Sequence, residues 1–530
     1  MSVKRILLVV LSCLAIALIG TSLLASIDRP QIQGRLQLYQ TNLLLRASGD
    51  LGEALPAPSI PGAEEEEEEE VLVQVRQSLL GQDFFAEALK QYQTVRQQDA
   101  AVRDRLTTAA DRAVFAGQVD EERQLRDQVR AATRSLAELD LRIGILQAHR
   151  ADLDAARRTW ESLENTVAEL PEPERSPLAP LTTLAADLDG LWTDPAAPPA
   201  DMAARSRQLD GWFADRVLAR TYGATGDEAA LVALVDRSRA IADRTLVELA
   251  IVNTVPLLGL LVGTGLLISL IVQRIRRGDQ AILSFGDRWR WEVPWDGEAI
   301  AQVLVLGFFF TGQLVLPLVL PAVSQLVLGV PPSALVGPAR AAFLLVQYGL
   351  LAGIGIAVLI YSIRPFGQLS GDWFRFRLGD RWWLWGLGGY LSALPIVVGI
   401  SLLNQPLWQG QGGSNPILAI ILESNDPWTV ACFVITAAIA APLFEETLFR
   451  GFLLPSLTRY MPVWAAITLS AFIFAIAHLS VSEVLPLMAL GIVLGVVYTR
   501  SRNLLASILL HGLWNGGTLI SLLFLAGAAR

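Results

Sequence analysis

Residues 437–450 read AAIAAPLFEETLFR, a membrane-like apolar run that ends in two adjacent carboxylates. The carboxylates are Glu445 and Glu446, and Arg450 follows four residues after the second. An ionised carboxylate at the centre of a membrane helix costs about 3 kcal/mol, so such groups are usually paired or take part in chemistry. Two of the three histidines of the chain, His478 and His511, lie in later apolar segments. This concentration of ionisable residues indicates an enzyme site inside a lipid bilayer.

The composition separates a membrane part from a soluble part. Apolar residues make up 52% of the 530 residues, and the mean hydropathy is +0.43, because long runs carry no charge. Residues 246–530 hold 15 basic and 13 acidic residues, whereas residues 31–245 hold 24 and 37. The sequence shows no cluster of Lys and Arg residues of the kind that binds nucleic acid. Only Cys13 and Cys432 occur, which excludes a disulfide framework and a cysteine-based metal site.

The N-terminus predicts a membrane anchor over residues 1–30. Lys4 and Arg5 precede an apolar run that extends to about Ala25, which is typical of a signal-anchor helix with a cytoplasmic N-terminus. A cleaved signal peptide is the alternative, although Ser26 and its predecessors form a poor cleavage site. Either interpretation sends residue 31 to the far side of the membrane.

The soluble part is predicted as a linker and a helical domain. Residues 31–70 are assigned to an acidic Pro/Glu linker that ends in seven consecutive glutamates. Residues 71–245 show apolar residues at helical spacing and are assigned to an extracytoplasmic helical domain, a candidate surface for a protein partner. The stretch 145–163 vaguely resembles half of a tetratricopeptide hairpin, without a clean repeat period. His149 is predicted to be an ordinary surface histidine.

Eight apolar segments after the anchor predict an all-α, polytopic membrane helix bundle of about nine spans. They lie at about 249–272, 299–322, 340–362, 383–403, 427–459, 463–479, 484–499 and 504–526. Additional transmembrane helices are assigned to residues 246–375 and the core to residues 376–530. Arginines at the loops between these segments fall mostly on one side, as the positive-inside rule requires, which is typical of a bacterial cytoplasmic membrane. Seven tryptophans near these loops predict interfacial anchors, at Trp289, Trp291, Trp295, Trp373, Trp382, Trp383 and Trp385.

Six residues recur at four-residue spacing on three predicted membrane helices, so each pair shares a helix face. The pairs are Glu446 with Arg450, Phe474 with His478, and His511 with Asn515. At about 1.5 Å per helical residue, Glu445, His478 and His511 lie roughly 14–22 Å from the cytoplasmic ends of their helices. These depths predict that polar groups from three helices meet in one layer of the membrane.

The three motifs resemble the signatures of the CPBP (Abi, or type II CAAX prenyl endopeptidase) family of intramembrane proteases. They are Glu445-Glu446-x-x-x-Arg450, Phe474-x-x-x-His478 and His511-x-x-x-Asn515, and the resemblance covers roughly residues 380–525. It implies an intramembrane metalloprotease whose substrate is a membrane-embedded or lipidated peptide or protein. It also implies that Glu446 and Arg450 form an electrostatic support pair and that Phe474 is a packing wall.

The resemblance implies roles for the other motif residues. Glu445 is expected to be the general base, or a shared base and metal ligand, and His478 and His511 to be metal ligands or water-positioning groups. Asn515 is expected to stabilise the oxyanion or to orient His511. One glutamate and two neutral histidines can bind Zn²⁺ with one position open for water, but a metal-free scheme stays open. The single-helix HExxH zinc motif is absent.

Two other functions use the same residues. A proton-coupled transporter would also place Glu, His and Arg inside the membrane, but the sequence shows no inverted repeat. A non-proteolytic scaffold or immunity-type membrane protein would use the acidic domain to bind its partner. Nothing in the sequence specifies a prenyl group on the substrate.

Overall fold

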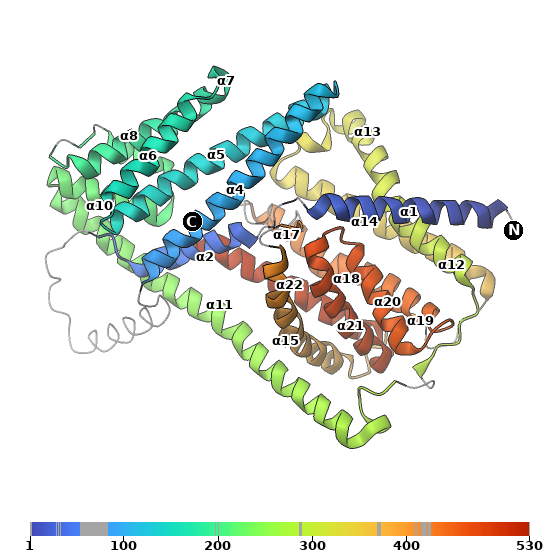
Figure 1. Cartoon of the computed structure of the whole chain (residues 1–530). Coiled ribbons are helices and arrows are strands. Elements are labelled where there is room, and N and C mark those ends of the chain that lie inside the picture. Colours follow the sequence, from blue (N-terminus) through green and yellow to red (C-terminus); the bar gives the residue numbers. More distant parts are fainter. Residues whose placement is uncertain are drawn as a thin grey trace. The chain divides into compact units, whose positions relative to one another are not determined.

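The computed structural model describes residues 3–27, 33–52, 83–196, 198–199, 201–285, 289–367, 373–408, 411–414 and 426–528, with residues 29, 31 and 421. Over this part of the chain the secondary structure is helical and contains no strand, so the all-α prediction is confirmed (Figure 1). The chain divides into two compact units. We call Met1–Ile32 with Asn253–Leu523 the membrane unit, and Gln33–Val252 with Phe524–Arg530 the helical unit. The predicted glutamate run at 64–70 lies outside the described residues.

Eight helices in the described ranges are long and apolar enough to cross a bilayer, which confirms a multi-pass membrane protein. They are α1 (Val3–Ile27), α11 (Glu228–Arg277), the run from α12 (Gly297–Ala301) through η5 (Gln302–Val315) to α13 (Leu316–Leu328), α14 (Gly337–Ile363), α15 (Trp382–Trp408), the run from α17 (Pro427–Val434) to α19 (Leu454–Leu457), α21 (Val484–Ser501) and α22 (Leu504–Ala528). The ninth predicted span forms α20 (Val463–Ile476), whose 14 residues extend only about 21 Å against a hydrocarbon layer of about 30 Å.

Three stretches of the membrane unit are wound as wider π-helices. They are η5, η8 (Ile435–Ala440) and η9 (Glu446–Leu453), with α18 (Ala441–Glu445) between the last two. Each ends two residues before a proline, at Pro317, Pro442 and Pro455. A proline ring clashes with the carbonyl four residues earlier, and that carbonyl lies in the π-helical turn in all three cases. The single α-helix predicted over 427–459 is therefore interrupted on both sides of Glu445.

At one end of the membrane unit, residues far apart in the sequence are joined by hydrogen bonds and ion pairs. The pairs are Lys4 with Glu298, Trp289 with Arg502, Trp295 with Arg459, and Arg375 with Leu504. The tryptophans at this end are not all interfacial anchors, because Trp291, Trp295 and Trp373 are buried among other side chains. Trp295 packs on Phe452 and donates its indole N–H to Ser456 Oγ at 2.8 Å. The interfacial prediction is thus wrong for these three, because their rings fill the protein core at this end.

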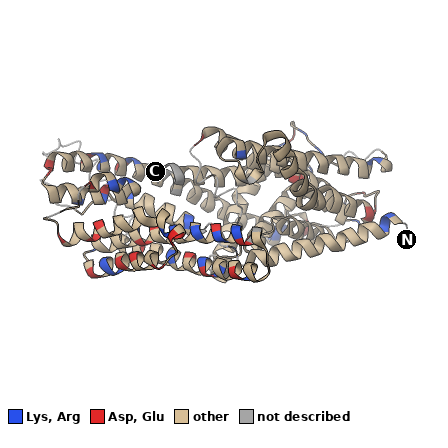
Figure 2. Ribbon diagram, turned by 90° about the horizontal axis from the view of Figure 1, so that it is seen from above, with Lys and Arg blue, Asp and Glu red and all other residues tan. Residues whose placement is uncertain are grey.

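The helical unit consists of antiparallel helices with a shared apolar core. Its elements are α2 (Gln33–Ser48), α4 (Phe84–Phe115), α5 (Val119–His149), α6 (Leu153–Ala168), α7 (Glu172–Arg175), η1 (Ser176–Leu178), α8 (Ala179–Thr193), α9 (Met202–Arg205), η2 (Ser206–Gln208) and α10 (Gly211–Thr225). Figure 2 shows charged residues spaced along these helices and few within the membrane unit. The linker predicted over 31–70 is wrong for residues 33–48, because α2 packs its apolar face into this unit.

His149 is not the surface histidine that the sequence predicts. Its side chain is 7% exposed and lies between the rings of Phe85 and Trp212, with centroid distances of 4.3 and 5.1 Å. Arg216 Nε donates to His149 Nδ1 at 3.1 Å. Burial, and then the Arg216 charge, lower the pKa of His149 from 6.5 to about 4. The imidazole is therefore neutral in the folded helical unit at neutral pH.

This burial predicts a pH-dependent stability of the helical unit. The unfolded chain binds a proton at His149 near pH 6.5 and the folded chain only near pH 4, so stability is complete above pH 6.5 and falls as the pH drops. Between pH 7 and pH 5 the loss is about 2 kcal/mol, or roughly 20-fold in the opening equilibrium. Hydrogen exchange in α5 and α10 of the full-length protein measures it. In the His149→Gln variant this loss of stability between pH 7 and pH 5 should disappear. An unchanged loss would contradict its attribution to His149.

Candidate functional site

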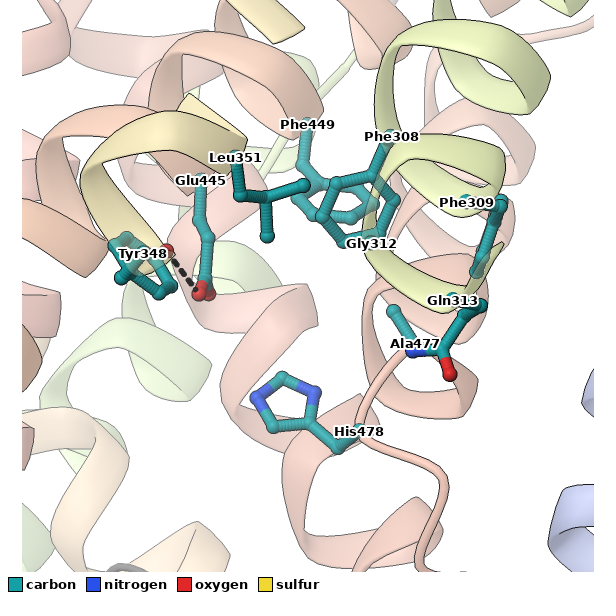
Figure 3. Close-up of a pocket in the computed structure, with 10 residues that line it drawn as sticks. All are labelled: Phe308, Phe309, Gly312, Gln313, Tyr348, Leu351, Glu445, Phe449, Ala477 and His478. Carbon is teal, nitrogen blue, oxygen red and sulfur yellow. Dashed lines mark hydrogen bonds between the residues drawn. The ribbon is translucent and has the colours of Figure 1, made fainter. Parts of the chain in front are cut away.

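Glu445 and His478 line one cavity of the membrane unit, of about 170 Å³ (Figure 3). Four parts of the chain build its wall: η5, α14, the helix around α18, and the C-terminal end of α20. The lining residues are Phe308, Phe309, Gly312, Gln313, Tyr348, Leu351, Glu445, Phe449, Ala477 and His478. In Figure 3 the carboxylate of Glu445 and the imidazole of His478 both point into this space. Two of the sequence-predicted site residues therefore meet, as their predicted depths require.

Tyr348 of α14 holds the Glu445 carboxylate in place, a contact that the sequence analysis missed. The Tyr348 hydroxyl donates to Glu445 Oε1 at 2.9 Å (Figure 3). A carboxylate in an apolar environment needs such donors, because water is not there to supply them. The one sign of this contact in the sequence is a tyrosine within a long uncharged span. That span does not indicate which side chain the tyrosine hydroxyl contacts.

The predicted ion pair of Glu446 and Arg450 is present and completely buried. Arg450 Nη1 donates to Glu446 Oε1 at 2.7 Å, and both side chains are 0% exposed. His511 Nδ1 lies 2.9 Å from the same oxygen. An ionised carboxylate only accepts, so His511 carries a proton on Nδ1, which in the neutral imidazole leaves Nε2 as an acceptor. The three side chains form a buried cluster from two helices, in which Glu446 Oε2 and Arg450 Nε have no hydrogen-bond partner among the described residues.

Gly491 and Phe474 complete the surroundings of the Arg450 guanidinium. Arg450 Nη2 donates to the Gly491 carbonyl at 3.3 Å, and the guanidinium carbon lies 4.3 Å from the Phe474 ring centre. A Cβ at Gly491 would lie 2.8 Å from Ala471 Cβ, so only glycine permits this approach of α21 to α20. The Phe474 ring also contacts both imidazoles edge-on, at 5.0 Å from His478 and 5.7 Å from His511.

His478 sits where α20 ends, and a network of hydrogen bonds fixes the turn that follows. His478 Nδ1 lies 2.9 Å from the Phe474 carbonyl, so Nδ1 carries a proton, which in the neutral imidazole leaves Nε2 as an acceptor. Leu479 then adopts the left-handed conformation, with φ 55°. The polar groups of the turn are satisfied by Ser26 at the end of α1, which accepts from Val481 N at 3.0 Å, and by Asn404, Gly412 and Gly413. The anchor helix thereby supports the turn next to His478.

Asn515 is committed to the backbone of the helix that carries Glu445. Its Nδ2 donates to the Ala437 carbonyl at 2.8 Å. In the π-helical stretch Ala441 N bonds to Thr436, and the next donor in that register would be residue 442, a proline without an N–H. Asn515 therefore satisfies a carbonyl that Pro442 leaves without a donor. Within the described residues no hydrogen bond links Asn515 to His511, which the sequence analysis considered.

The metal set predicted from the sequence is not assembled. Across the described ranges, no group of three or more His, Cys, Asp or Glu side chains is arranged to hold a metal ion. Glu445 and His478 share the cavity, but His511 Nδ1 is bound to Glu446 and its ring packs on Phe474. These residues do not fit a Zn²⁺ site in this arrangement, and Zn²⁺ stays a prediction of the sequence.

Comparisons with known proteins identify the part of the chain that holds the motifs. Residues 427–517 match the family model described as type II CAAX prenyl endopeptidase Rce1-like. An uncharacterized 24.3 kDa protein of Escherichia coli is 31% identical over 24% of this chain and 59% of its own length. The membrane-embedded CAAX protease MroQ of Staphylococcus aureus is 27% identical over 26% of this chain and 56% of its own length.

The chain thus spans little more than half the length of these curated relatives. A search of solved structures gives no significant match. Tyr348 and the η5 wall of the cavity lie outside the matched residues 427–517. The predicted resemblance is confirmed for the C-terminal region: residues 427–517, which carry all three motifs, are similar to the type II CAAX prenyl endopeptidases.

Proposed function

We propose that the protein is an intramembrane endopeptidase that hydrolyses a peptide bond in the cavity between Glu445 and His478. The observation that carries this proposal is that a carboxylate and an imidazole line one small cavity, with Nδ1 of the imidazole bound to the Phe474 carbonyl and Nε2 left without a hydrogen-bond partner among the described residues. Two acceptors on one cavity can hold both protons of a water molecule and leave its lone pair free to attack a carbonyl carbon. The match of residues 427–517 to a peptidase family supports the same chemistry.

In this mechanism Glu445 is the general base and His478 orients the water. Glu445 takes a proton from the water as its oxygen attacks the scissile carbonyl, and later returns this proton to the leaving amide nitrogen. His478 Nε2 accepts the other proton in a hydrogen bond, which fixes the direction of attack. The aromatic wall of Phe308, Phe309 and Phe449 lowers the local dielectric and strengthens both interactions.

Tyr348 couples the base to the developing oxyanion. In the resting site its hydroxyl donates to the ionised Glu445. When Glu445 takes the proton, the negative charge moves to the carbonyl oxygen of the substrate. The Tyr348 hydroxyl then donates its hydrogen bond to that oxygen instead of to Glu445. The Gln313 side chain lines the same cavity and supplies an amide donor. The Glu446–Arg450–His511 cluster takes no proton in this scheme and holds Phe474 and its neighbours in place.

We also propose a membrane location and a substrate class for the enzyme. The protein is an integral multi-pass membrane protein, and we place it in a bacterial cytoplasmic membrane with the helical unit outside the cytoplasm, from the charge bias of the loops. The substrate is a membrane-embedded or membrane-associated peptide or protein, and the helical unit is the candidate site for a protein partner. A Zn²⁺ site at Glu445, His478 and His511 would use Nε2 of His511, because its Nδ1 donates to Glu446. Metal content of the purified wild type and His511→Ala proteins tests that option.

Replacing Glu445 by glutamine tests the general base. Glutamine keeps an acceptor for Tyr348 but cannot take a proton, so cleavage should fall by about 100-fold or more while the protein stays folded. Purified full-length protein in lipid nanodiscs, with new peptide N-termini counted by mass spectrometry, gives the rate. Glu292→Gln, an exposed carboxylate outside the cavity, is the matched control. Unchanged turnover in Glu445→Gln would overturn the proposal.

Replacing Tyr348 by phenylalanine tests the role of its hydroxyl, which is to donate first to Glu445 and then to the oxyanion. Loss of a hydrogen bond to a charged group costs about 1.5–3 kcal/mol, so kcat should fall by roughly 10–100-fold with little change in KM. Tyr361→Phe is the control, because Tyr361 lies on the same helix and is 72% exposed. Equal activities of the two variants would remove Tyr348 from the mechanism.

A further inference from the structure

Resting on the proposed function, we infer that the cavity beside Glu445 is a subsite for one uncharged, apolar peptide side chain next to the scissile bond. Leucine and phenylalanine are the side chains that it takes, and a prenyl chain is not.

The wall of the cavity is chemically divided. Glu445, His478, Tyr348 and Gln313 provide the polar groups, and the other lining residues are aromatic, aliphatic or glycine. Phe308 and Phe449 meet edge-to-face, with ring centres 5.6 Å apart, and form a continuous apolar surface. A charged side chain placed against these rings would lose its hydration without gaining a partner, whereas an apolar side chain gains from burial. The scissile bond is then held at the polar side of the cavity.

The volume limits what can enter. An apolar cavity of about 150 Å³ is enough for one benzene molecule, and this cavity measures about 170 Å³. A benzyl or isobutyl side chain therefore fits within it. A prenyl chain is a branched polyene several times longer than a benzene ring and exceeds this space. The cavity is thus suited to a peptide side chain, although the family match names prenyl substrates.

Gly312 of η5 sets the depth of the cavity. A Cβ added there would lie 3.4 Å from Leu351 Cδ1, which is ordinary contact, so a small side chain is accommodated without a clash. A larger side chain at residue 312 would extend into the space next to Leu351 and reduce the volume left for the substrate. Both residues lie before residue 427, so helices outside the matched region decide this specificity.

The experiment uses membrane-anchored peptides that differ only in the residue beside the cleaved bond: Leu, Phe, Ala, Asp or S-farnesyl-cysteine. Full-length wild-type protein in nanodiscs should cleave the Leu and Phe peptides at least roughly 10-fold faster than the Asp and farnesyl peptides. Gly312→Val should lower kcat/KM for the Phe peptide roughly 10-fold more than for the Ala peptide. Gly349→Val is the matched control, because Gly349 lies on α14 with open space around its Cβ position.

A second variant changes the cavity in the opposite direction. Leu351→Ala enlarges it and should shift the preference toward bulkier side chains such as tryptophan, so the inference does not depend on one variant folding. Equal losses for all peptides in Gly312→Val, or a preference for the farnesyl peptide, would overturn the subsite while Glu445-dependent cleavage persists. If Glu445→Gln cleaves every peptide as fast as wild type, the proposed function itself fails, and the subsite fails with it.

Discussion

The burial of charge inside an apolar bundle is the constraint on which the membrane unit depends. Glu446, Arg450 and His511 are shielded from solvent, so each must find its partner in the protein. Arg450 and His511 both contact Glu446 Oε1, and the Arg450 guanidinium lies over the Phe474 ring, so these contacts bring three helices together around Phe474. Removing Glu446 or Arg450 would leave a buried charge without compensation, at a cost of about 3–5 kcal/mol. Glu446 is engaged in this cluster, whereas Glu445 faces the cavity.

The prolines of the membrane unit shape the site through the backbone. Each π-helical stretch precedes a proline, and the stretches on either side of α18 set where Glu445 and Glu446 point. The carbonyl that Pro442 leaves without a donor is bound by Asn515, so α22 is attached to the helix that carries both glutamates. Gly512, next to His511, allows this approach, because a Cβ there would lie 2.8 Å from the Ala438 carbonyl oxygen. The π-helical stretch before Pro442 thus helps to align the Glu445-Glu446 motif with the motif of His511 and Asn515.

The sequence predicted the features that depend on composition and spacing. Hydropathy located the membrane helices, and four-residue spacing predicted the pair of Glu446 and Arg450. Features that depend on contacts between distant segments were missed. The hydroxyl of Tyr348 meets a carboxylate 97 residues later, and His149 is enclosed by aromatic rings from two other helices. The short α20 was predicted too long, because apolar residues continue to His478 although the helix ends before it.

The most direct test of the account is an experimental structure of the Glu445→Gln protein with an uncleaved membrane peptide bound. The scissile carbonyl should lie between residue 445 and His478, with a water molecule on both side chains and an apolar substrate side chain against Phe308 and Phe449. A peptide bound elsewhere, with lipid or packed aliphatic side chains separating residue 445 from His478, would contradict it.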